Sequence, residues 1–429
     1  MIRILLLAML AFTVAAPAAA QDAADPEPLT LIHAGQLLTE AGLPIRGAST
    51  IFVRGSRIEA IEDGHVSRSG AEYLDYSNFT VLPGLIDLHT HISGDPGRDY
   101  RDRATTPDEW GVVVGIKNMR LTALDGFTTV RVPGIGNDVG NVLRRGGDEG
   151  IIAGPRILHS GHSLSIIGGH GDISGFREEV LDALDGNNTC TGAQECAARV
   201  REAGRRGVDF IKITATGGVL SQQARGLDQH FTDEEMRAIV TTAHALGMHV
   251  AAHAHGPRGI EAAARAGVDS IEHGTFADDA ALRAMRDNGT VFVPTLMAYT
   301  GIRERLGTGI YTPPVEAKIR ETLAVVGQAA RRAHAMGIPV LFGTDAGVFE
   351  HGRNAEELGM YVDMVGMTPT EVLRSATTGA AELLGLEGEI GRLAPGYSAD
   401  LIVTAGDPAT DIRVLEDLEF VMVRGREVE

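Results

Sequence analysis

Short apolar runs alternate with longer helical stretches across residues 81–388, and this alternation constrains the fold more than any other feature of the chain. Parallel strands need a long crossover between them, usually a helix, so the pattern predicts an α/β fold with a parallel sheet. Eight runs in roughly 300 residues predict a (β/α)8 TIM barrel with insertions. We expect its strands at Val81–Leu88, Thr128–Val132, Arg156–His159, Phe210–Thr214, His249–His253, Ser270–Glu272, Val291–Pro294 and Val340–Gly343.

Helix boundaries support this prediction. Thr232 and Glu235 have the spacing of a capping box, as do Thr368 and Glu371. In this motif the threonine hydroxyl and the glutamate satisfy backbone amides at the start of a helix. Gly247 and Gly267 stand where helices should end before the next strand.

The two ends of the chain have a different pattern, with short β-type runs separated by turn residues. We expect residues 21–80 and 389–429 to build one small β-sandwich domain, with the barrel at 81–388 between its two halves. The runs are Leu29–His33, Ser49–Arg54 and Arg57–Ile61 near the start, and Ala399–Thr404 and Phe420–Arg426 near the end.

The first twenty residues are typical of a secretory signal peptide. Arg3 gives a positive start, an apolar run follows from Ile4 to Ala16, and alanines at 18–20 make a small-residue cleavage site. The run is short for a spanning helix, and no cysteine follows directly, so we expect no membrane anchor after signal removal. The mature protein is expected to be exported, either periplasmic or secreted.

The only two cysteines are Cys190 and Cys196. In an oxidising compartment we expect them to form a short-loop disulfide, and the alternative is two free thiols at a helix start. The formal charge of −19 disfavours nucleic acid as a partner, because polyanions would be repelled. The charge itself is best interpreted as a means of solubility.

Residues that can bind metal stand at the ends of several predicted strands. In a TIM barrel, chemistry gathers at the C-terminal ends of the strands. One such residue alone is more often structural, and an aspartate before Ala-Gly can simply cap a helix. Together, however, the set predicts a transition-metal site, since imidazole suits zinc and related ions. The set is His89, His91, Lys212, His253, His273 and Asp345.

Lys212 is the informative member of this set. Burial inside an apolar strand penalises its charged form and lowers its pKa. A neutral lysine can react with carbon dioxide to give a carbamate, an anion with two oxygens that can bridge two divalent ions. The alternative is a lysine paired with a buried carboxylate, with Asp209 and Asp87 as candidate partners.

These residues resemble the ligand set of the amidohydrolase superfamily, in its binuclear class with a carbamylated lysine. Residues 83–91 are similar to the family's opening signature, and residues 394–401 to its closing one. The likeness spans nearly the whole mature chain and is greatest to the imidazolonepropionase-like group, which contains Xaa-Pro-type dipeptidases and amidases that cleave ochratoxin A. Further similar motifs are Gly168-Gly-His-Gly-Asp172, Thr216-Gly-Gly-Val219 and His253-Ala-His-Gly256.

The resemblance implies two divalent ions, zinc by expectation. His89 and His91 would hold the buried ion with Asp345, His253 and His273 the outer ion, and the Lys212 carbamate would bridge them. A metal-bridging hydroxide would attack the amide carbonyl. Asp345 would accept its proton and pass it to the leaving nitrogen.

The substrate is expected to be a small amide: a dipeptide, an N-acyl amino acid or an ochratoxin A-type amide that releases a C-terminal amino acid. His170 is the candidate for binding the terminal carboxylate of the substrate, and Arg225, Tyr299 and His255 are further candidates for substrate contact. Two alternatives stay open here: a cyclic amide or lactone hydrolase on the same metals, and a catalytically inactive secreted binding protein. The resemblance also implies a homo-oligomer.

Overall fold

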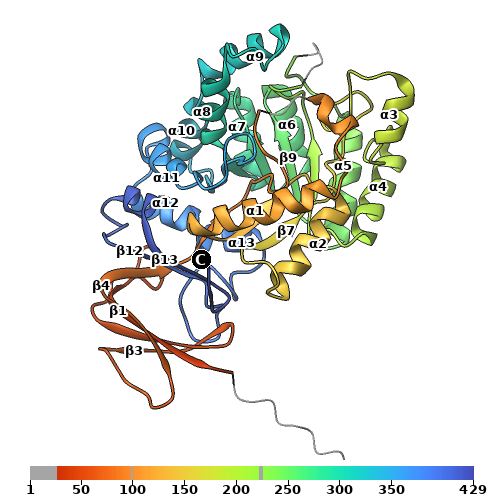
Figure 1. Ribbon diagram of the computed structural model, residues 1–429. Helices are drawn as coiled ribbons and strands as arrows, with labels where there is room; N and C mark the ends of the chain where they lie inside the picture. The colour runs from red at the N-terminus through yellow and green to blue at the C-terminus, as the bar shows by residue number, and fades with distance from the viewer. Residues whose placement is uncertain (1–26, 98–99, 222–225) are drawn as a thin grey trace, which may run out of the picture.

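The computed structural model describes residues 27–97, 100–221 and 226–429. A β-sheet at one end of the molecule carries a larger α/β body, and helices surround the strands of that body (Figure 1). The proposed signal peptide at residues 1–20 lies outside the described residues. Within the described part of the chain, no helix has the length and apolar character needed to cross a membrane.

Both ends of the chain contribute to one seven-stranded sheet with the order β14-β13-β12-β4-β1-β2-β3. β4 joins the two ends, because it pairs in parallel with β1 and antiparallel with β12. The ends therefore combine in one sheet, whereas their folding into two packed layers stays a prediction. The strands are β1 (Leu29–Leu37), β2 (Ser49–Arg54), β3 (Arg57–Asp63), β4 (Glu72–Pro83), β12 (Leu401–Thr404), β13 (Leu418–Val423) and β14 (Arg426–Glu427).

The predicted strand at Val81–Leu88 was wrong as a single element. β4 ends at Pro83, and β5 (Leu85–Asp87) begins a different sheet. The chain changes partners at Gly84, whose amide donates to Asp400 O at 3.0 Å, while the Leu85 amide donates to Gly126 O at 2.9 Å. A Cβ on Gly84 would lie 2.3 Å from the Thr128 side chain, so the close approach requires glycine.

The body contains two parallel sheets, with the orders β5-β6-β7 and β11-β10-β9-β8. A parallel bridge between Leu164 and Ile213 connects the segment that follows β7 to β8 of the second sheet. Six of the eight predicted strands reappear nearly at the predicted bounds: β6 (Phe127–Val132), β7 (Arg156–His159), β8 (Ile211–Thr214), β9 (Val250–Ala254), β10 (Ser270–His273) and β11 (Val291–Val293).

The eighth run, Val340–Gly343, is not a regular strand, although it lies between β11 and β5. The amide of Leu341 donates to Phe292 O at 2.8 Å, and the amide of Leu88 donates to Phe342 O at 3.1 Å. The Phe342 amide instead bonds Ser375 O, so the regular ladder is interrupted. The parallel sheets and these connections are consistent with a TIM barrel.

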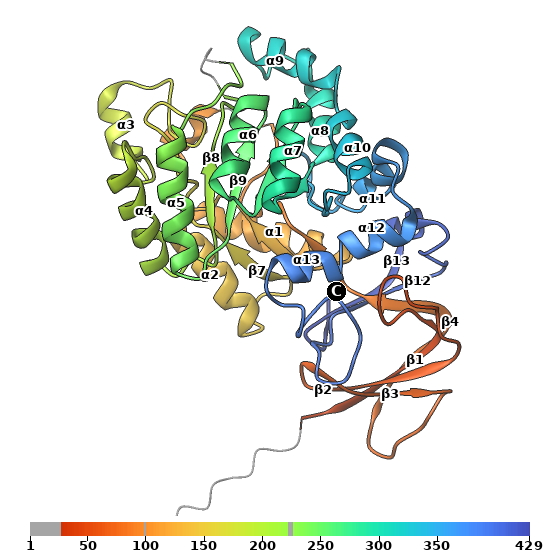
Figure 2. The ribbon, with the colours of Figure 1, turned by 180° about the vertical axis from the view of Figure 1, so that it is seen from behind.

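Helices follow the strands and cover their outer side (Figure 2). Both predicted capping boxes are present, at the starts of α5 and α12. The helices are α1 (Trp110–Leu124), α2 (Asn137–Asp148), α3 (Glu178–Leu184), α4 (Ala193–Arg205), α5 (Asp233–Ala245), α6 (Pro257–Ala266), α7 (Asp279–Asn288), α8 (Leu296–Arg305), α9 (Pro313–Leu323), α10 (Gln328–Ala335), α11 (Glu356–Met360), α12 (Pro369–Ser375) and α13 (Thr378–Leu383), with shorter turns at η1 (Tyr100–Ala104), η2 (Tyr361–Val365) and η3 (Ile412–Glu416).

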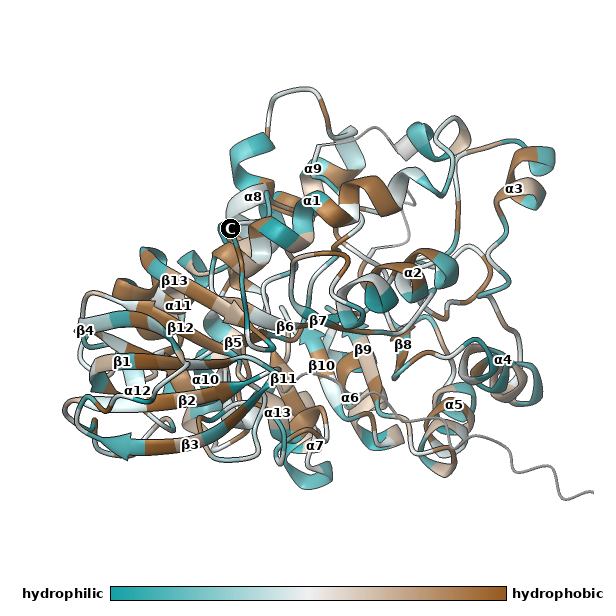
Figure 3. Cartoon of the chain, turned by 60° about the horizontal axis from the view of Figure 1, so that its bottom comes forward, coloured by the Kyte–Doolittle hydropathy of each residue, from teal (hydrophilic) through white to brown (hydrophobic). Residues whose placement is uncertain are grey.

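The position of the helices over the strands follows from their apolar faces, which are buried against the strands. Helices such as α5 and α7 carry both hydrophilic and hydrophobic stretches along the chain (Figure 3). α5 buries Met236, Ile239, Val240 and Ala243, at the spacing of one helical face. β8 and β9 are buried along their whole length, as expected for parallel strands covered on both sides.

The predicted disulfide between Cys190 and Cys196 is present. Both cysteines are buried beside the segment that follows β7. The amide of Cys190 donates to Ser165 O, and the amide of Ser165 donates to Asn188 O, each at 3.0 Å. The disulfide therefore anchors a segment that supports the loop carrying His170.

Candidate metal centre

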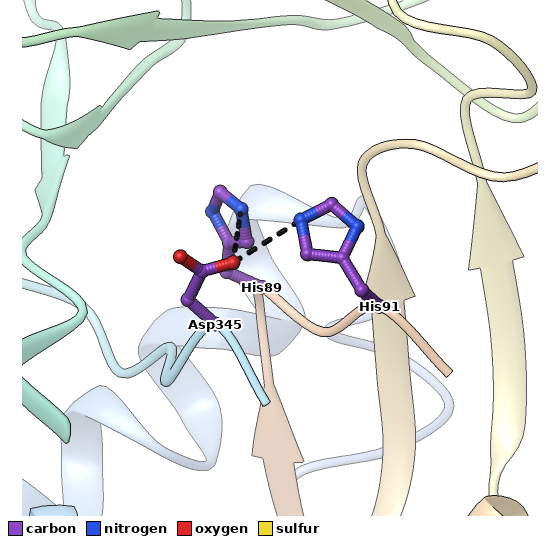
Figure 4. Close-up of side chains that lie close together, drawn as sticks. All are labelled: His89, His91 and Asp345. Carbon is purple, nitrogen blue, oxygen red and sulfur yellow. Dashed lines mark ion pairs between the residues drawn. The ribbon is translucent and has the colours of Figure 1, made fainter. Parts of the chain in front are cut away.

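Three predicted ligands meet where β5 and the eighth run end. His91 Nε2 lies 3.1 Å from Asp345 Oδ1, and His89 Nε2 lies 3.5 Å from the same oxygen. One ligand atom from each of the three residues falls within 4.8 Å of the others, a grouping that can hold a metal ion. Figure 4 shows both imidazoles directed toward the carboxylate. The backbone supports this meeting, because the amide of Asp345 donates to His89 O at 2.6 Å.

Hydrogen bonds from the Nδ1 atoms of these two histidines fix the orientation of each ring. His89 Nδ1 donates to Glu272 Oε2 at 2.7 Å, and His91 Nδ1 donates to Gly134 O at 3.2 Å. A carboxylate or carbonyl oxygen only accepts, so in both rings the hydrogen stands on Nδ1. In the neutral form of each ring, Nε2 then carries the lone pair and is directed at the site, which is the form in which histidine binds metal.

Behind His89 lies a buried ion pair that sequence reasoning missed. Arg131 Nη2 donates to Glu272 Oε1 at 2.7 Å, and Arg131 Nη1 donates to Ser270 Oγ at 3.1 Å. Arg131 and Glu272 are almost wholly inaccessible to solvent. Two opposite charges on the apolar runs of β6 and β10 were the available signal, because a charge inside a buried strand demands a partner.

The second group of predicted residues forms a cluster of imidazoles next to the first. The ring centre of His273 lies 5.0 Å from that of His89 and 4.7 Å from that of His253. His253 in turn lies 4.1 Å from His170 and 4.6 Å from His255, measured between ring centres. The structure therefore brings the strand-end histidines of β9 and β10 beside those that follow β5.

Hydrogen bonds also orient the rings of this second group. His253 Nε2 donates to Gly217 O at 3.4 Å, which leaves Nδ1 as the nitrogen that can bind a metal ion. His273 Nδ1 is bonded to Thr295 Oγ1 at 2.7 Å, which directs its Nε2 the other way. Burial lowers the pKa of His89, His253 and His273 well below the usual value, so all three are neutral at pH 7. Neutral imidazole is the ligand form.

Lys212 occupies buried strand β8 as predicted. Burial lowers its pKa to about 8, even though the charges of Glu272 and Asp345 act in the opposite direction. The two carboxylates weighed as its partners are engaged elsewhere. Asp209 is bound by Arg144 at 2.7 and 2.8 Å, and Asp87 accepts from Thr344, Asn354 and the His89 amide.

Asp345 is held as an anion. Burial raises its pKa, but the nearby His89, His91 and Lys212 outweigh burial and keep the pKa below its usual value. The backbone around it is strained: Asp345 has φ 64°, His273 φ 70° and Thr295 φ 50°. Non-glycine residues in the left-handed region concentrate at functional sites, where surrounding contacts hold them in place.

The predicted substrate-contact residues differ in their placement. His170 Nδ1 is bonded to Ser221 Oγ at 2.6 Å, beside the His253 ring. His255 Nδ1 is bonded to Thr275 Oγ1 at 2.7 Å, and Thr275 is in turn bonded to the Tyr299 hydroxyl at 2.5 Å. These three side chains are therefore gathered next to the second histidine group, whereas Arg225 lies outside the described residues.

Lys318 of α9 is a second residue that sequence reasoning missed. Its ammonium donates to Gly218 O at 2.8 Å and to Ser221 O at 2.7 Å, in the segment that bonds His170. Burial lowers its pKa to about 8. Burial lowers the pKa of His170 and His255, and the charge of Lys318 lowers both further. Lys318 lies on the buried face of α9 together with Val315 and Ile319. No local pattern in the sequence of this helix indicated the contact.

Neutral imidazoles and a buried carboxylate at the carboxyl ends of parallel strands define a class of hydrolases that use divalent metals. The model of the amidohydrolase family matches residues 80–428. The crystal structure of a Xaa-Pro dipeptidase with bound methionine superposes with a TM-score of 0.86 and 36% sequence identity, covering 93% of this chain and 99% of that one.

Two curated proteins extend the comparison. The ochratoxinase of Aspergillus niger is 30% identical over 426 residues, which cover 92% of this chain and 85% of that protein. The imidazolonepropionase of Mesorhizobium japonicum is 26% identical over 353 residues, covering 78% and 80%. The chain belongs to the amidohydrolase family. It is a hydrolase that acts on amide bonds.

Proposed function

We propose that the protein is a binuclear metal-dependent amide hydrolase that releases a C-terminal amino acid from dipeptides or N-acyl amino acids. One observation carries the proposal: the His89, His91 and Asp345 group adjoins a second pair, His253 and His273, beside Lys212. Each group would supply donors for one ion. The charge of Lys212 acts on residues of both groups, which supports this lysine as the bridging residue.

The residues present fit two divalent ions, zinc by preference. Burial keeps His89, His253 and His273 neutral, and Asp345 is an anion, as metal ligands must be. The Nδ1 of His91 donates to Gly134 O, which directs its Nε2 at the site. Lys212 is partly neutral near pH 8, which permits carbamate formation with carbon dioxide. When bound, divalent ions supply a water of lowered pKa and polarise the substrate carbonyl.

The residues of the chain would then complete the reaction. Asp345 would take a proton from the attacking water and return it to the leaving amide nitrogen. Its buried position and its lowered pKa keep it ionised before the reaction begins. His89 and His91 are held rigidly from behind by Glu272 and Gly134 O, so the site is organised before substrate arrives.

The proposed preference for a substrate with a carboxylate is supported by Lys318 and His170 on one side of the site. Lys318 and His170 meet at the 217–221 segment, in a chain whose formal charge is −19. A local cation in an acidic protein favours a substrate with a carboxylate next to the scissile bond. Both a Xaa-Pro dipeptidase and an ochratoxinase are among the similar proteins, so proline-containing dipeptides and ochratoxin A-type amides belong in the first assay.

The test is a substrate panel on the metal-loaded enzyme. Chelation should abolish turnover of dipeptides and N-acyl amino acids, and added Zn²⁺ should restore it. Hydantoins and lactones serve as comparison substrates in the same assay. Faster turnover of the cyclic compounds than of every linear amide would overturn the proposal.

We also propose that the parallel sheets close into a barrel, that the protein is exported, and that it self-associates. The bridges Phe292 to Val340 and Thr90 to Ala346 support closure of the parallel sheets into a (β/α)8 barrel. The disulfide supports export, because such bonds persist in oxidising compartments. Exposed Trp110, Val113 and Ile116 on α1 support self-association. Cell fractionation tests export, and light scattering after chromatography tests self-association.

A further inference from the structure

The start of helix α8 is capped by a side chain from another helix. Glu357, in α11, accepts the Leu296 amide on Oε1 at 2.7 Å and the Met297 amide on Oε2 at 2.9 Å. Its exposed fraction is 0%. Both carboxyl oxygens thus accept from the first two amides of α8, which have no partner within the helix. The N-cap side chain ordinarily bonds the second or third amide of a helix, so Glu357 takes over part of its role.

The N-cap residue of α8 is Thr295, and its side chain makes no hydrogen bond to the helix it precedes. Instead its Oγ1 is bonded to His273 Nδ1 at 2.7 Å. Thr295 adopts φ 50° and ψ 56°, which a β-branched residue takes only when its surroundings impose it. Because Glu357 performs the capping, the threonine hydroxyl is released to hold the imidazole.

We propose that Glu357 is a positioning residue that fixes the orientation of His273 through the start of α8 and Thr295. Glu357 touches neither His273 nor the reacting atoms. It locks the two amides that follow Thr295, which holds the strained threonine in place and directs His273 Nε2 toward the outer ion. This inference rests on the proposed function, in which His273 is a ligand of that ion.

Both oxygens of the Glu357 side chain are required for this role. Two amides converge on one side chain, and both need an acceptor. Glutamine has the same shape but offers one oxygen and one NH2 group, so one α8 amide would face another donor. The buried amide would lose its partner, and the N-terminal turn of α8 would have to shift. Glu357→Gln therefore separates the role of the carboxylate from the role of its volume.

The experiment measures zinc affinity directly, by competition of the metal-free protein with a chromophoric chelator. The wild-type protein should bind two equivalents. In E357Q, one equivalent should weaken by about 10–100-fold, as is common when a group behind a metal ligand is lost, and the other should stay unchanged. Glu356→Gln is the matched control, because Glu356 lies on the same helix but pairs with Arg353. It should bind as the wild type does.

Thr295 provides the second arm of the test. Thr295→Val removes the hydroxyl and should weaken the same equivalent, while Thr295→Ser keeps the hydroxyl and should restore most of the affinity. If Glu357 acts through Thr295, adding E357Q to T295V should cause little further loss. Independent, additive losses would overturn the proposed route.

The outcomes distinguish the two proposals. A wild-type protein that binds fewer than two equivalents overturns the binuclear function and this inference with it. A wild-type protein with two equivalents, together with E357Q affinities equal to those of E356Q, overturns this inference alone. A purely structural role would lower the melting temperature of metal-free E357Q and leave its affinities intact. If E357Q does not fold, unchanged zinc affinity in T295V overturns the inference.

Discussion

Lys212 shows how one residue can join local chemistry to a whole site. Burial in β8 disfavours its charged form. When charged, its amine adds to the lowering of the pKa of His253 and His273. The first prediction concerns Lys212→Ala, which should lower kcat/KM by at least about 100-fold, since even groups behind a ligand cost 10–100-fold. Acetate or propionate should restore part of the activity, because a short carboxylate can replace the proposed bridging carbamate. Full activity of the variant without added carboxylate would contradict the bridging role.

Asp125 provides a prediction about pH and stability. Burial raises its pKa to about 7, although the Ala355 amide donates to it at 2.8 Å. In the unfolded chain the carboxyl has its ordinary pKa near 3.8, so between about pH 4 and 7 the folded state binds more protons. The contribution of Asp125 therefore falls as pH rises through this window and is lost above pH 7.

Asp125→Asn should remove this dependence. The stability of the variant relative to the wild type should grow from pH 4 to 7 and then level off at about 1–3 kcal/mol, a discounted value for a shift of this size. Urea unfolding at several pH values measures the difference. A constant difference from pH 4 to 8 would show that Asp125 titrates normally in the folded protein.

At the scale of elements, the ion pair between β6 and β10 makes a clear prediction. Glu272→Gln would leave Arg131 buried without its anionic partner, which should cost about 3–5 kcal/mol of unfolding free energy in the metal-free protein. Glu149→Gln is the matched control, because Glu149 pairs with Arg145 on the exposed surface of α2. It should cost less than about 1 kcal/mol, since water already screens the exposed pair. Equal losses in urea unfolding would show that burial does not strengthen the Arg131–Glu272 pair.

For the whole molecule, metal removal should lower stability as well as activity. The proposed ligands come from the segment after β5, from β8, β9 and β10, and from the end of the eighth run, so bound ions would tie much of the body together. Metal at about 1,000 times its Kd adds about 4 kcal/mol to the free energy of unfolding. Chelation should therefore lower the melting temperature, and Zn²⁺ should restore it. A melting temperature that chelator and zinc do not change would contradict metal binding by the folded state.

The sequence determined the features that depend on short-range patterns. Alternating apolar runs predicted six strands close to their observed bounds, and Thr232 and Thr368 marked two helix starts, because periodicity and capping act over a few residues. His89, His91 and Asp345 were found together because strand ends in a parallel sheet share one edge. Only the tertiary structure decided where β4 gives way to β5, since that break depends on Thr128 packing against Gly84. It also decided which groups stand behind the proposed ligands. Glu357, Thr295, Arg131 and Lys318 reach the site from distant segments, through contacts that no local pattern encodes.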